Sequence, residues 1–212
     1  MSRDVKYWDK ISGRPMSLVE NLKSRPVFEA LIRTTLALRP GDRVLDVGCG
    51  TGGYLHVLRE AVGEKGEVLA LDYSPKMAEK AKARAAQWDN VEVRHADATT
   101  TDLPTNHYDA ALASFSISAT QNVPATVANI HQALREGGRL FAPDMHLVPS
   151  GLGAPLIRTF RLLYQATARW TGVDVLETIQ TQFGTTQPVT AEGTPLTTLP
   201  KFAPVLMITA QK

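Results

Sequence analysis

Residues 44–53 read VLDVGCGTGG, an apolar run that passes into a glycine-rich turn. The run holds β-branched residues, which favour a strand, and the segment 54–62 that follows has helical spacing. Glycine tolerates positive φ and leaves room for a ligand beside the backbone. The start of a helix adds free N–H groups and a partial positive charge. The stretch therefore predicts a strand, a ligand-binding turn and a helix in succession.

The same alternation continues on both sides of this stretch. Helical spacing is seen at residues 27–38, 74–87 and 124–134, and apolar runs typical of strands are seen at 67–72, 91–94, 108–113 and 138–142. Strands separated by helices predict βαβ units and a parallel sheet with helices on both faces. We therefore expect a doubly wound α/β sheet that binds its ligand at the carboxyl ends of the strands.

The last third of the chain departs from this pattern. Residues 156–170 form an amphipathic pattern with a basic face, which fits a core-facing helix, a substrate lid or a helix on a lipid surface. We predict strands near 175–181 and 204–209, joined by a Gly/Thr/Pro-rich connection over 184–200. Because that connection has no helix signal, we expect the last two strands to pair antiparallel.

Length and composition fit one globular domain, residues 1–212. The chain has 43% apolar and 21% charged residues and a net charge of +2, which is too mild to predict nucleic-acid binding. A single cysteine, Cys49, excludes an internal disulfide and a cysteine-rich metal site. The first residues show no secretory signal, and no run reaches the ~20 apolar residues that cross a bilayer. We expect a cytoplasmic protein without a metal and without an integral membrane contact.

Three acids follow or end the predicted strands in positions that suit a nucleoside ligand. Asp46 lies inside the first strand, where a buried carboxylate needs a donor such as a loop N–H or a ligand ammonium. Asp72 ends the second strand and can accept from two ribose hydroxyls. Asp97 follows the third strand and can accept from an exocyclic amine, while the N–H of Ala98 donates to a ring nitrogen. Together these groups predict a site for an adenosine-containing cofactor.

Residues 44–52, 71–72, 96–98 and 134–140 resemble the successive motifs of class I S-adenosylmethionine-dependent methyltransferases. The resemblance covers roughly residues 25–145 and is strongest toward methyltransferases of small molecules and lipids, of the ubiquinone/menaquinone C-methyltransferase and the phosphatidylethanolamine N-methyltransferase kind. It implies a seven-stranded, mostly parallel sheet whose last strand is antiparallel. It also implies S-adenosyl-L-methionine as the cofactor.

The resemblance further implies where the cofactor lies. Gly48, Gly50 and Gly52 would lie under its methionine part, with Ser114 nearby. Asp72 would hold the ribose and Asp97 the adenine amine. The remaining implied contacts, on the adenine face, are Tyr73 and Met77. Residues 1–40 are then expected to cap the site, 41–145 to bind the cofactor, and 146–212 to supply an acceptor-pocket helix and a terminal β-hairpin.

Methyl transfer from a sulfonium is an in-line displacement, which the protein promotes by proximity and orientation. His146 is the candidate base or orienting group. Many members of the family carry a histidine pair at the positions of Ser118 and Ala119. The acceptor, a small aromatic or lipid-like molecule, is expected to contact Phe115 and Ser118. Tyr7, together with its neighbour Trp8, is a candidate for closing over the site.

Two alternatives remain open. Gly48, Gly50 and Gly53 also satisfy the G-x-G-x-x-G pattern of dinucleotide sites, so an NAD(P)-dependent oxidoreductase is the rival enzyme class. The non-enzymatic alternative is a module that binds the cofactor without transferring its methyl group. The sequence leaves the acceptor atom, the oligomeric state and contact with a lipid surface open.

Overall fold

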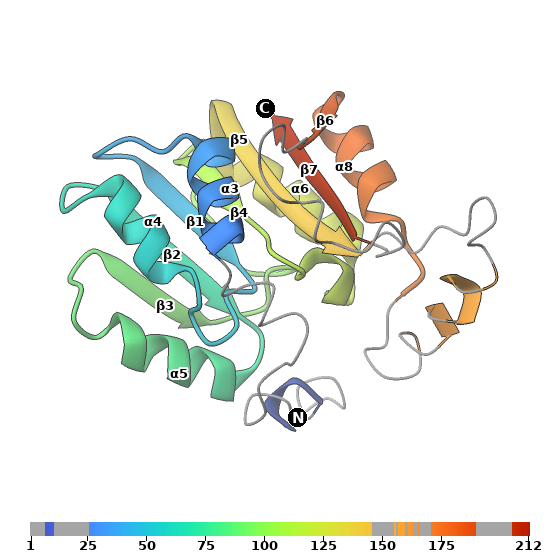
Figure 1. Cartoon of the computed structure of the whole chain (residues 1–212), viewed down its shortest axis with the longest axis horizontal. Helices are drawn as coiled ribbons and strands as arrows, with labels where there is room; N and C mark the ends of the chain where they lie inside the picture. The colour runs from blue at the N-terminus through green and yellow to red at the C-terminus, as the bar shows by residue number, and fades with distance from the viewer. Residues whose placement is uncertain are drawn as a thin grey trace.

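The computed structural model describes residues 7–10, 26–145, 155, 157–159, 161–162, 165, 171–189 and 205–212. Within them a seven-stranded sheet has the order β3-β2-β1-β4-β5-β7-β6. Figure 1 shows this sheet running through the molecule with helices on both sides. The elements are α3 (Pro26–Leu36), β1 (Arg43–Val47), α4 (Leu55–Val62), β2 (Glu67–Asp72), α5 (Pro75–Ala85), β3 (Val91–His95), β4 (Tyr108–Leu112), η1 (Ile117–Ala119), α6 (Val123–Ala133), β5 (Leu134–Met145), α8 (Val175–Phe183), β6 (Thr186–Pro188) and β7 (Val205–Gln211).

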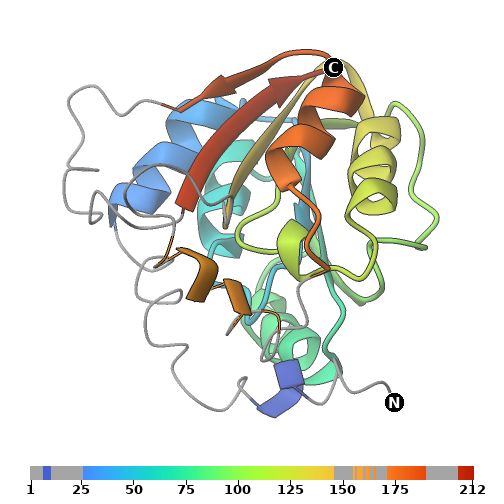
Figure 2. The ribbon, with the colours of Figure 1, turned by 90° about the vertical axis from the view of Figure 1, so that its right-hand side faces the viewer.

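The first five strands are parallel, and β7 pairs antiparallel with both β5 and β6. The doubly wound sheet and its antiparallel last strand, both predicted from sequence, are therefore confirmed. The helices divide between the two faces: α3, α4 and α5 pack on one, and α6 and α8 on the other. Figure 2 shows these layers from the side. Strand β1 lies between β2 and β4, so its end is at the middle of the carboxyl edge.

Local signals account for the helix starts next to that edge. Ser74 caps α5 because its hydroxyl accepts from the N–H of Met77 at 3.2 Å, and Pro75 occupies the first turn. Asn122 caps α6 in the same way, accepting from Ala125 at 3.1 Å. These caps fix where the chain leaves each strand-end loop.

The strand predicted near 175–181 is wrong, because Val175–Phe183 is helix α8. Asp174 begins this helix, since its carboxylate accepts from two N–H groups of the first turn. Val175, Ile179 and Phe183 are buried at a spacing of four residues, which is a helical stripe. The antiparallel pairing near the end of the chain is present, but the partner of β7 on that side is the short β6.

The predicted helix over 156–170 lies largely outside the described residues. No helix among the residues that the structure describes combines the length and the apolar character needed to span a bilayer.

Candidate functional site

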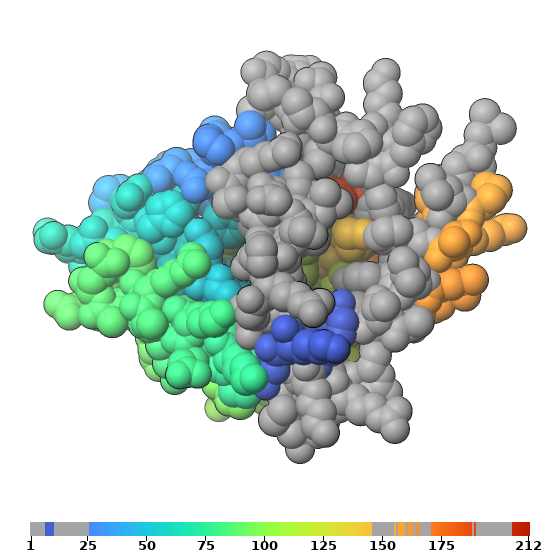
Figure 3. All heavy atoms as spheres, turned by 60° about the horizontal axis from the view of Figure 1, so that its bottom comes forward, coloured from blue at the N-terminus to red at the C-terminus, as the bar shows by residue number. Residues whose placement is uncertain are grey.

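A cleft opens at the carboxyl ends of β1, β2, β3 and β4. Ligand sites of open α/β sheets lie at this edge. Figure 3 shows this side of the molecule, where residues 7–10 lie against the segment that contains α5. The cleft is lined by Trp8, Val47, Gly48, Gly50, Leu71, Asp72, Tyr73, Met77, Ala96, Asp97, Ala98, Phe115, Ser116, Ala119, Thr120 and Gln121.

The glycine loop is bound to the neighbouring strand. The N–H groups of Gly48 and Cys49 both donate to the carbonyl oxygen of Leu71, at 2.8 and 2.9 Å. Gly48, Gly50 and Gly52 have φ of +70°, +58° and +81°, a region that other residues adopt only with strain. The loop therefore needs these glycines for its own backbone, whatever it binds.

Gly48 also touches the loop after β4. A Cβ atom at Gly48 would lie 2.4 Å from the Cβ of Ser116, which is too close for any real contact. The Ser116 hydroxyl donates to the carbonyl oxygen of Val47 at 2.6 Å. The side chain of Ser116, after β4, is thus hydrogen-bonded to the backbone at the end of β1, and both residues line the cleft.

Asp72 reaches across from the end of β2 to the glycine loop. One carboxylate oxygen accepts from the N–H of Gly50 at 2.7 Å, and the other accepts from the N–H of Ser74 at 2.8 Å. Asp72 lines the cleft, and a carboxylate at this strand end is a position that binds a pair of ribose hydroxyls in sheets of this kind.

Asp97 and Ala98 present an acceptor and a donor on the next strand end. Asp97 accepts from the N–H of Thr99 at 2.9 Å through Oδ1. Its Oδ2 and the N–H of Ala98 have no hydrogen-bond partner among the described residues. Both residues line the cleft, and an adjacent acceptor and donor match the edge of an adenine ring.

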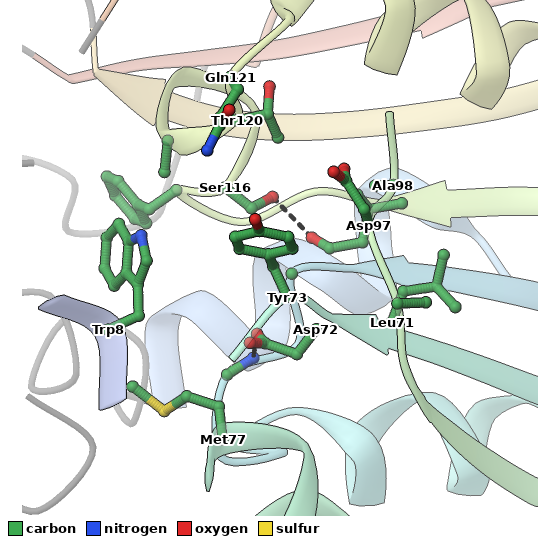
Figure 4. Close-up of a pocket in the computed structure, with 16 residues that line it drawn as sticks. Trp8, Leu71, Asp72, Tyr73, Met77, Asp97, Ala98, Ser116, Thr120 and Gln121 are labelled. Atoms are coloured by element: carbon green, nitrogen blue, oxygen red, sulfur yellow. Dashed lines mark hydrogen bonds between the residues drawn. The ribbon is translucent and has the colours of Figure 1, made fainter. Parts of the chain in front are cut away.

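Apolar side chains complete this part of the cleft. Figure 4 shows the ring of Tyr73 between Asp72 and Asp97, with Met77 and Trp8 on the other side of the view. Trp8 meets the ring of Tyr7 edge to face at 5.1 Å. Trp8 thus lines the cleft, whereas Tyr7, the sequence candidate, packs against Trp8 and is not among the lining residues.

Asp9 attaches the N-terminal turn to α5. Its carboxylate accepts from the hydroxyl of Ser74 at 2.6 Å and from the N–H of Lys76 at 3.4 Å. Asp9 is buried. A negative charge at the start of a helix is favourable. No local sequence pattern indicates this contact, because it joins residues more than sixty positions apart.

The loop after β4 supplies the opposite wall. Phe115 has a φ of +53°, which is unusual for an aromatic residue. Its N–H donates to Pro143 at 2.7 Å, and its ring lies 6.0 Å from that of Phe28 in α3. The sequence expected Phe115 near the acceptor, and the structure places it on the cleft wall.

Four predicted residues lie behind the lining. Asp46 and Ser114 are each 3% exposed, and Gly52 lies against α5 near Ala81. Ser118 is fully buried and belongs to η1. The hydroxyl of Ser114 has no hydrogen-bond partner within the described part of the chain.

Ser118 is bound to Asp144, a residue that sequence reasoning missed. The Asp144 carboxylate accepts from the hydroxyl of Ser118 at 2.5 Å, from its N–H at 3.0 Å, and from the N–H of Met145 at 2.7 Å. Burial raises the pKa of Asp144, and these hydrogen bonds oppose the shift. The pair holds η1 against β5, just before the lining residues 119–121.

Three sequence candidates lie outside the described residues. They are His146, the proposed base, and two residues of the chain after β5, Leu147 and Phe160, whose apolar side chains suit an aromatic or lipid-like acceptor. Among the lining residues described above, the ionisable side chains are Asp72, Tyr73 and Asp97, and none is a lysine, arginine or histidine.

The strand order, the glycine loop and the three strand-end acids define a domain of the class I S-adenosylmethionine-dependent methyltransferase type. Residues 44–138 match the model of the family described as "Methyltransferase domain".

Curated relatives agree with this family. The chain is 33% identical to the 2-phytyl-1,4-naphtoquinone methyltransferase of Synechococcus elongatus, over 60% of this chain and 54% of the relative. It is 30% identical to the demethylmenaquinone methyltransferase of Staphylococcus aureus, over 75% of this chain and 61% of the relative. The chain thus spans little more than half the length of these relatives.

Solved structures show the same fold. The YcgJ protein from Bacillus subtilis superposes with a TM-score of 0.67 at 19% identity, over 87% of this chain and 97% of that one. An S-adenosylmethionine-dependent methyltransferase from Mesorhizobium loti superposes with a TM-score of 0.65 at 22% identity, over 90% of this chain and all of that one.

Proposed function

We propose that the chain transfers the methyl group of S-adenosyl-L-methionine to a small aromatic acceptor of the quinone type. The observation that carries the proposal is the series of acceptors and donors along one cleft: the glycine loop, Asp72, and the pair Asp97–Ala98. The relatives named for naphthoquinone and menaquinone methylation support the acceptor class.

The residues present fit the cofactor. Asp72 would hold the ribose hydroxyls, and Asp97 Oδ2 with the Ala98 N–H would bind adenine. Tyr73 and Met77 would pack against the ring, with Trp8 covering it. The loop at Gly48 and Gly50 would lie under the methionine part.

When bound, the cofactor supplies the electrophilic methyl group. The chain's own part is to orient the acceptor in line with that group and to exclude water. Holding two reactants in such a geometry can supply roughly 7–11 kcal/mol of the barrier. Phe115 and the residues after η1, Thr120 and Gln121, would form the wall that faces the acceptor.

The division of the chain follows from these positions. Residues 1–40 would cap the cofactor, as the contact of Asp9 with Ser74 supports, and 41–145 would bind it. Residues 146–212, with His146 as candidate base, would complete the acceptor pocket. The lone thiol of Cys49, which is buried, is consistent with a cytoplasmic location.

Calorimetry with S-adenosylhomocysteine tests the proposal. We expect binding by the wild type and a loss of about 10- to 100-fold in Asp72→Ala, because charge-assisted hydrogen bonds contribute about 1.5–3 kcal/mol. Asp89→Ala, at an exposed position, is the matched control. Binding of NADH in place of S-adenosylhomocysteine would instead support the oxidoreductase alternative.

Transfer is tested separately with a reduced 1,4-naphthoquinone and S-adenosylmethionine carrying a labelled methyl group. Label in the naphthoquinone product is the expected result. Cofactor binding without transfer to any quinol, phenol or amine acceptor would identify a binding module and overturn the enzymatic assignment.

A further inference from the structure

A second cleft lies at the opposite, amino edge of the sheet. It is formed by the first residues of β2, β3 and β4 and by the turns at 64–66 and 89–90, which lead into β2 and β3. It shares no lining residue with the cleft at the carboxyl edge. The proposed methyl transfer makes no use of it, so its role must be argued from its own residues.

One face of the sheet is uncovered at this cleft. The alternation along β2 and β3 turns Glu67, Glu92 and Arg94 to the face opposite α4 and α5. The connection from β3 to β4, residues 96–107, contains no helix that could cover them. Their side chains are accordingly 61%, 60% and 44% exposed. The starts of β2 and β3 therefore present charged groups that a ligand can reach.

The charged side chains that line this cleft are mostly acidic. Four carboxylates accompany one lysine and one arginine there: Glu64, Glu67, Asp89, Glu92, Lys65 and Arg94. The guanidinium of Arg94 is already engaged, because it donates to both oxygens of Glu92 at 2.6 and 2.8 Å. With this pair set aside, three carboxylates remain against Lys65. The cleft is therefore suited to a ligand with positive charge.

Tyr108 adds a buried hydroxyl group to this cleft. Tyr108 is only 4% exposed, and its ring meets the ring of His107 edge to face at 5.0 Å. Within the described residues its hydroxyl makes no hydrogen bond. Burial raises the pKa of Tyr108, so the phenol stays protonated and can both donate and accept. Because buried polar groups are nearly always paired, this hydroxyl points to a ligand in the cleft.

Glu67 is a second group with unused hydrogen-bonding capacity. Its Oε2 lies 3.7 Å from Nε of Arg43 and 3.9 Å from Nε2 of His107, and both distances exceed those of hydrogen bonds. The charge of Glu67 acts on Tyr108, so the carboxylate and the phenol lie near each other in the cleft. An ammonium group between them could donate to both.

The arrangement favours an organic amine over a metal ion. A metal ion needs several ligands that converge on one point, and no three His, Cys, Asp or Glu side chains of the described chain do so. The lining carboxylates instead come from two turns and two strands. An alkyl chain with ammonium groups at intervals can reach such separated carboxylates, while its methylene groups pack on Leu69 and Pro104.

We propose that the cleft at the amino edge binds a linear organic amine with two or more ammonium groups. One ammonium would donate to the carboxylate of Glu67 and to the oxygen of Tyr108, and a second would lie against Glu64 at the rim. This site is independent of methyl transfer, so its test succeeds or fails apart from that of the proposed function.

Calorimetry with spermidine at low ionic strength tests the proposal, because salt screens exposed charges. We expect the wild type to bind one equivalent. Glu67→Gln should weaken binding about 10-fold, since it removes the charge from a hydrogen bond, and Tyr108→Phe should weaken it about 3-fold. The melting temperature of Tyr108→Phe should stay the same or rise, because the deleted hydroxyl has no partner among the described residues.

Glu136→Gln is the matched control. Glu136 is an exposed carboxylate of β5 that lines neither cleft, and its substitution changes the net charge by the same amount as Glu67→Gln. This variant should bind spermidine as the wild type does. Mg²⁺ is the control ligand, because it carries two positive charges at a single point.

The outcomes decide whether the cleft is an amine site. Selective weakening in Glu67→Gln and Tyr108→Phe supports it. An equal loss in Glu67→Gln and Glu136→Gln would show a general attraction to charge, and Mg²⁺ binding as tight as that of spermidine would show a site for point charges. Either result overturns the inference, as do an absence of spermidine binding and unchanged binding in Tyr108→Phe.

Discussion

The ionisation of Asp144 affects the wall of the cleft, because Asp144 binds Ser118 of η1 and the lining residues 119–121 follow directly. It is 1% exposed and is held by donors from η1 and from its own strand end. Many members of the family that the chain resembles carry two histidines at this point of the loop after β4, where this chain has Ser118 and Ala119. In this chain the Ser118 side chain is used to satisfy a buried carboxylate. In this chain, Ser118 therefore has a structural role, because it holds the buried carboxylate of Asp144.

The raised pKa of Asp144 predicts a pH trend in stability. The folded state holds this proton more tightly than the unfolded state, so the free energy of unfolding falls as pH rises from the ordinary aspartate pKa to the raised value. Asp144→Asn lacks this titration. We expect the stability of the wild type relative to the variant to decrease between about pH 4 and the raised pKa.

Urea unfolding of both proteins across this pH range measures the trend. A constant difference in unfolding free energy between the two proteins is not diagnostic. Asparagine places an N–H₂ group against donors that Asp144 accepts from, which lowers stability at every pH. Two stability curves that stay parallel at every pH would contradict a raised pKa.

At the scale of elements, the N-terminal turn is fastened to the start of α5. Asp9 contacts Ser74 and Lys76, and Trp8 beside it lines the cleft. We predict that Asp9→Ala weakens binding of S-adenosylhomocysteine by about 3- to 10-fold, since a lost hydrogen bond costs about 0.5–1.5 kcal/mol. Calorimetry measures the loss, with Lys10→Ala, at an exposed neighbour, as the control.

Tryptophan fluorescence gives an independent view of the same turn. We predict that binding of S-adenosylhomocysteine changes the emission of Trp8, because the ligand would contact its ring. Trp8→Phe should abolish the change. Trp88 packs against the apolar cluster that contains α3, α4 and α5, so Trp88→Phe should retain it. A signal that survives in Trp8→Phe would show that the turn does not cover the ligand.

The elements that sequence predicts well are those with a repeated period and a clear cap. The helix over Pro75–Ala85 has serine and proline at its start, and the central strands are continuous apolar runs. The sequence of α8 favours a strand because its valine, isoleucine and threonines are β-branched residues. Asp174, which caps the first turn, is the local signal for a helix at this position.

The site divides in a similar way. Asp72, Asp97 and the glycines stand at strand ends, so the chain order alone brings them together. Asp9 and Asp144 act through contacts between distant segments, which no local pattern reveals.

At the scale of the whole molecule, the carboxyl edge of the sheet gathers negative charge. Asp46 lies in β1, Asp72 ends β2 and Asp97 follows β3, and no lysine or arginine is among the described lining residues. Such a cleft favours a cationic ligand. S-adenosylmethionine and S-adenosylhomocysteine differ by the positive charge on sulfur.

We therefore predict that salt weakens the binding of S-adenosylmethionine more than the binding of S-adenosylhomocysteine. Raising ionic strength from about 0.1 M to about 1 M shortens the Debye length from about 10 Å to about 3 Å. The ratio of the two dissociation constants, measured by calorimetry, should shift against S-adenosylmethionine. An unchanged ratio would mean that these carboxylates do not act on the sulfur.

The contact between Gly48 and Ser116 couples the glycine loop after β1 to the loop after β4, so that neither can move alone. A methyl group added at position 48 cannot be absorbed locally, because the side chain that it would strike is itself hydrogen-bonded to the backbone of β1. Any repair must move the turn after β4, and with it Phe115 and the residues facing the acceptor. Efforts to re-engineer this protein for new acceptors should accordingly keep both Gly48 and Ser116 and vary Thr120 and Gln121, which line the cleft further along the second loop.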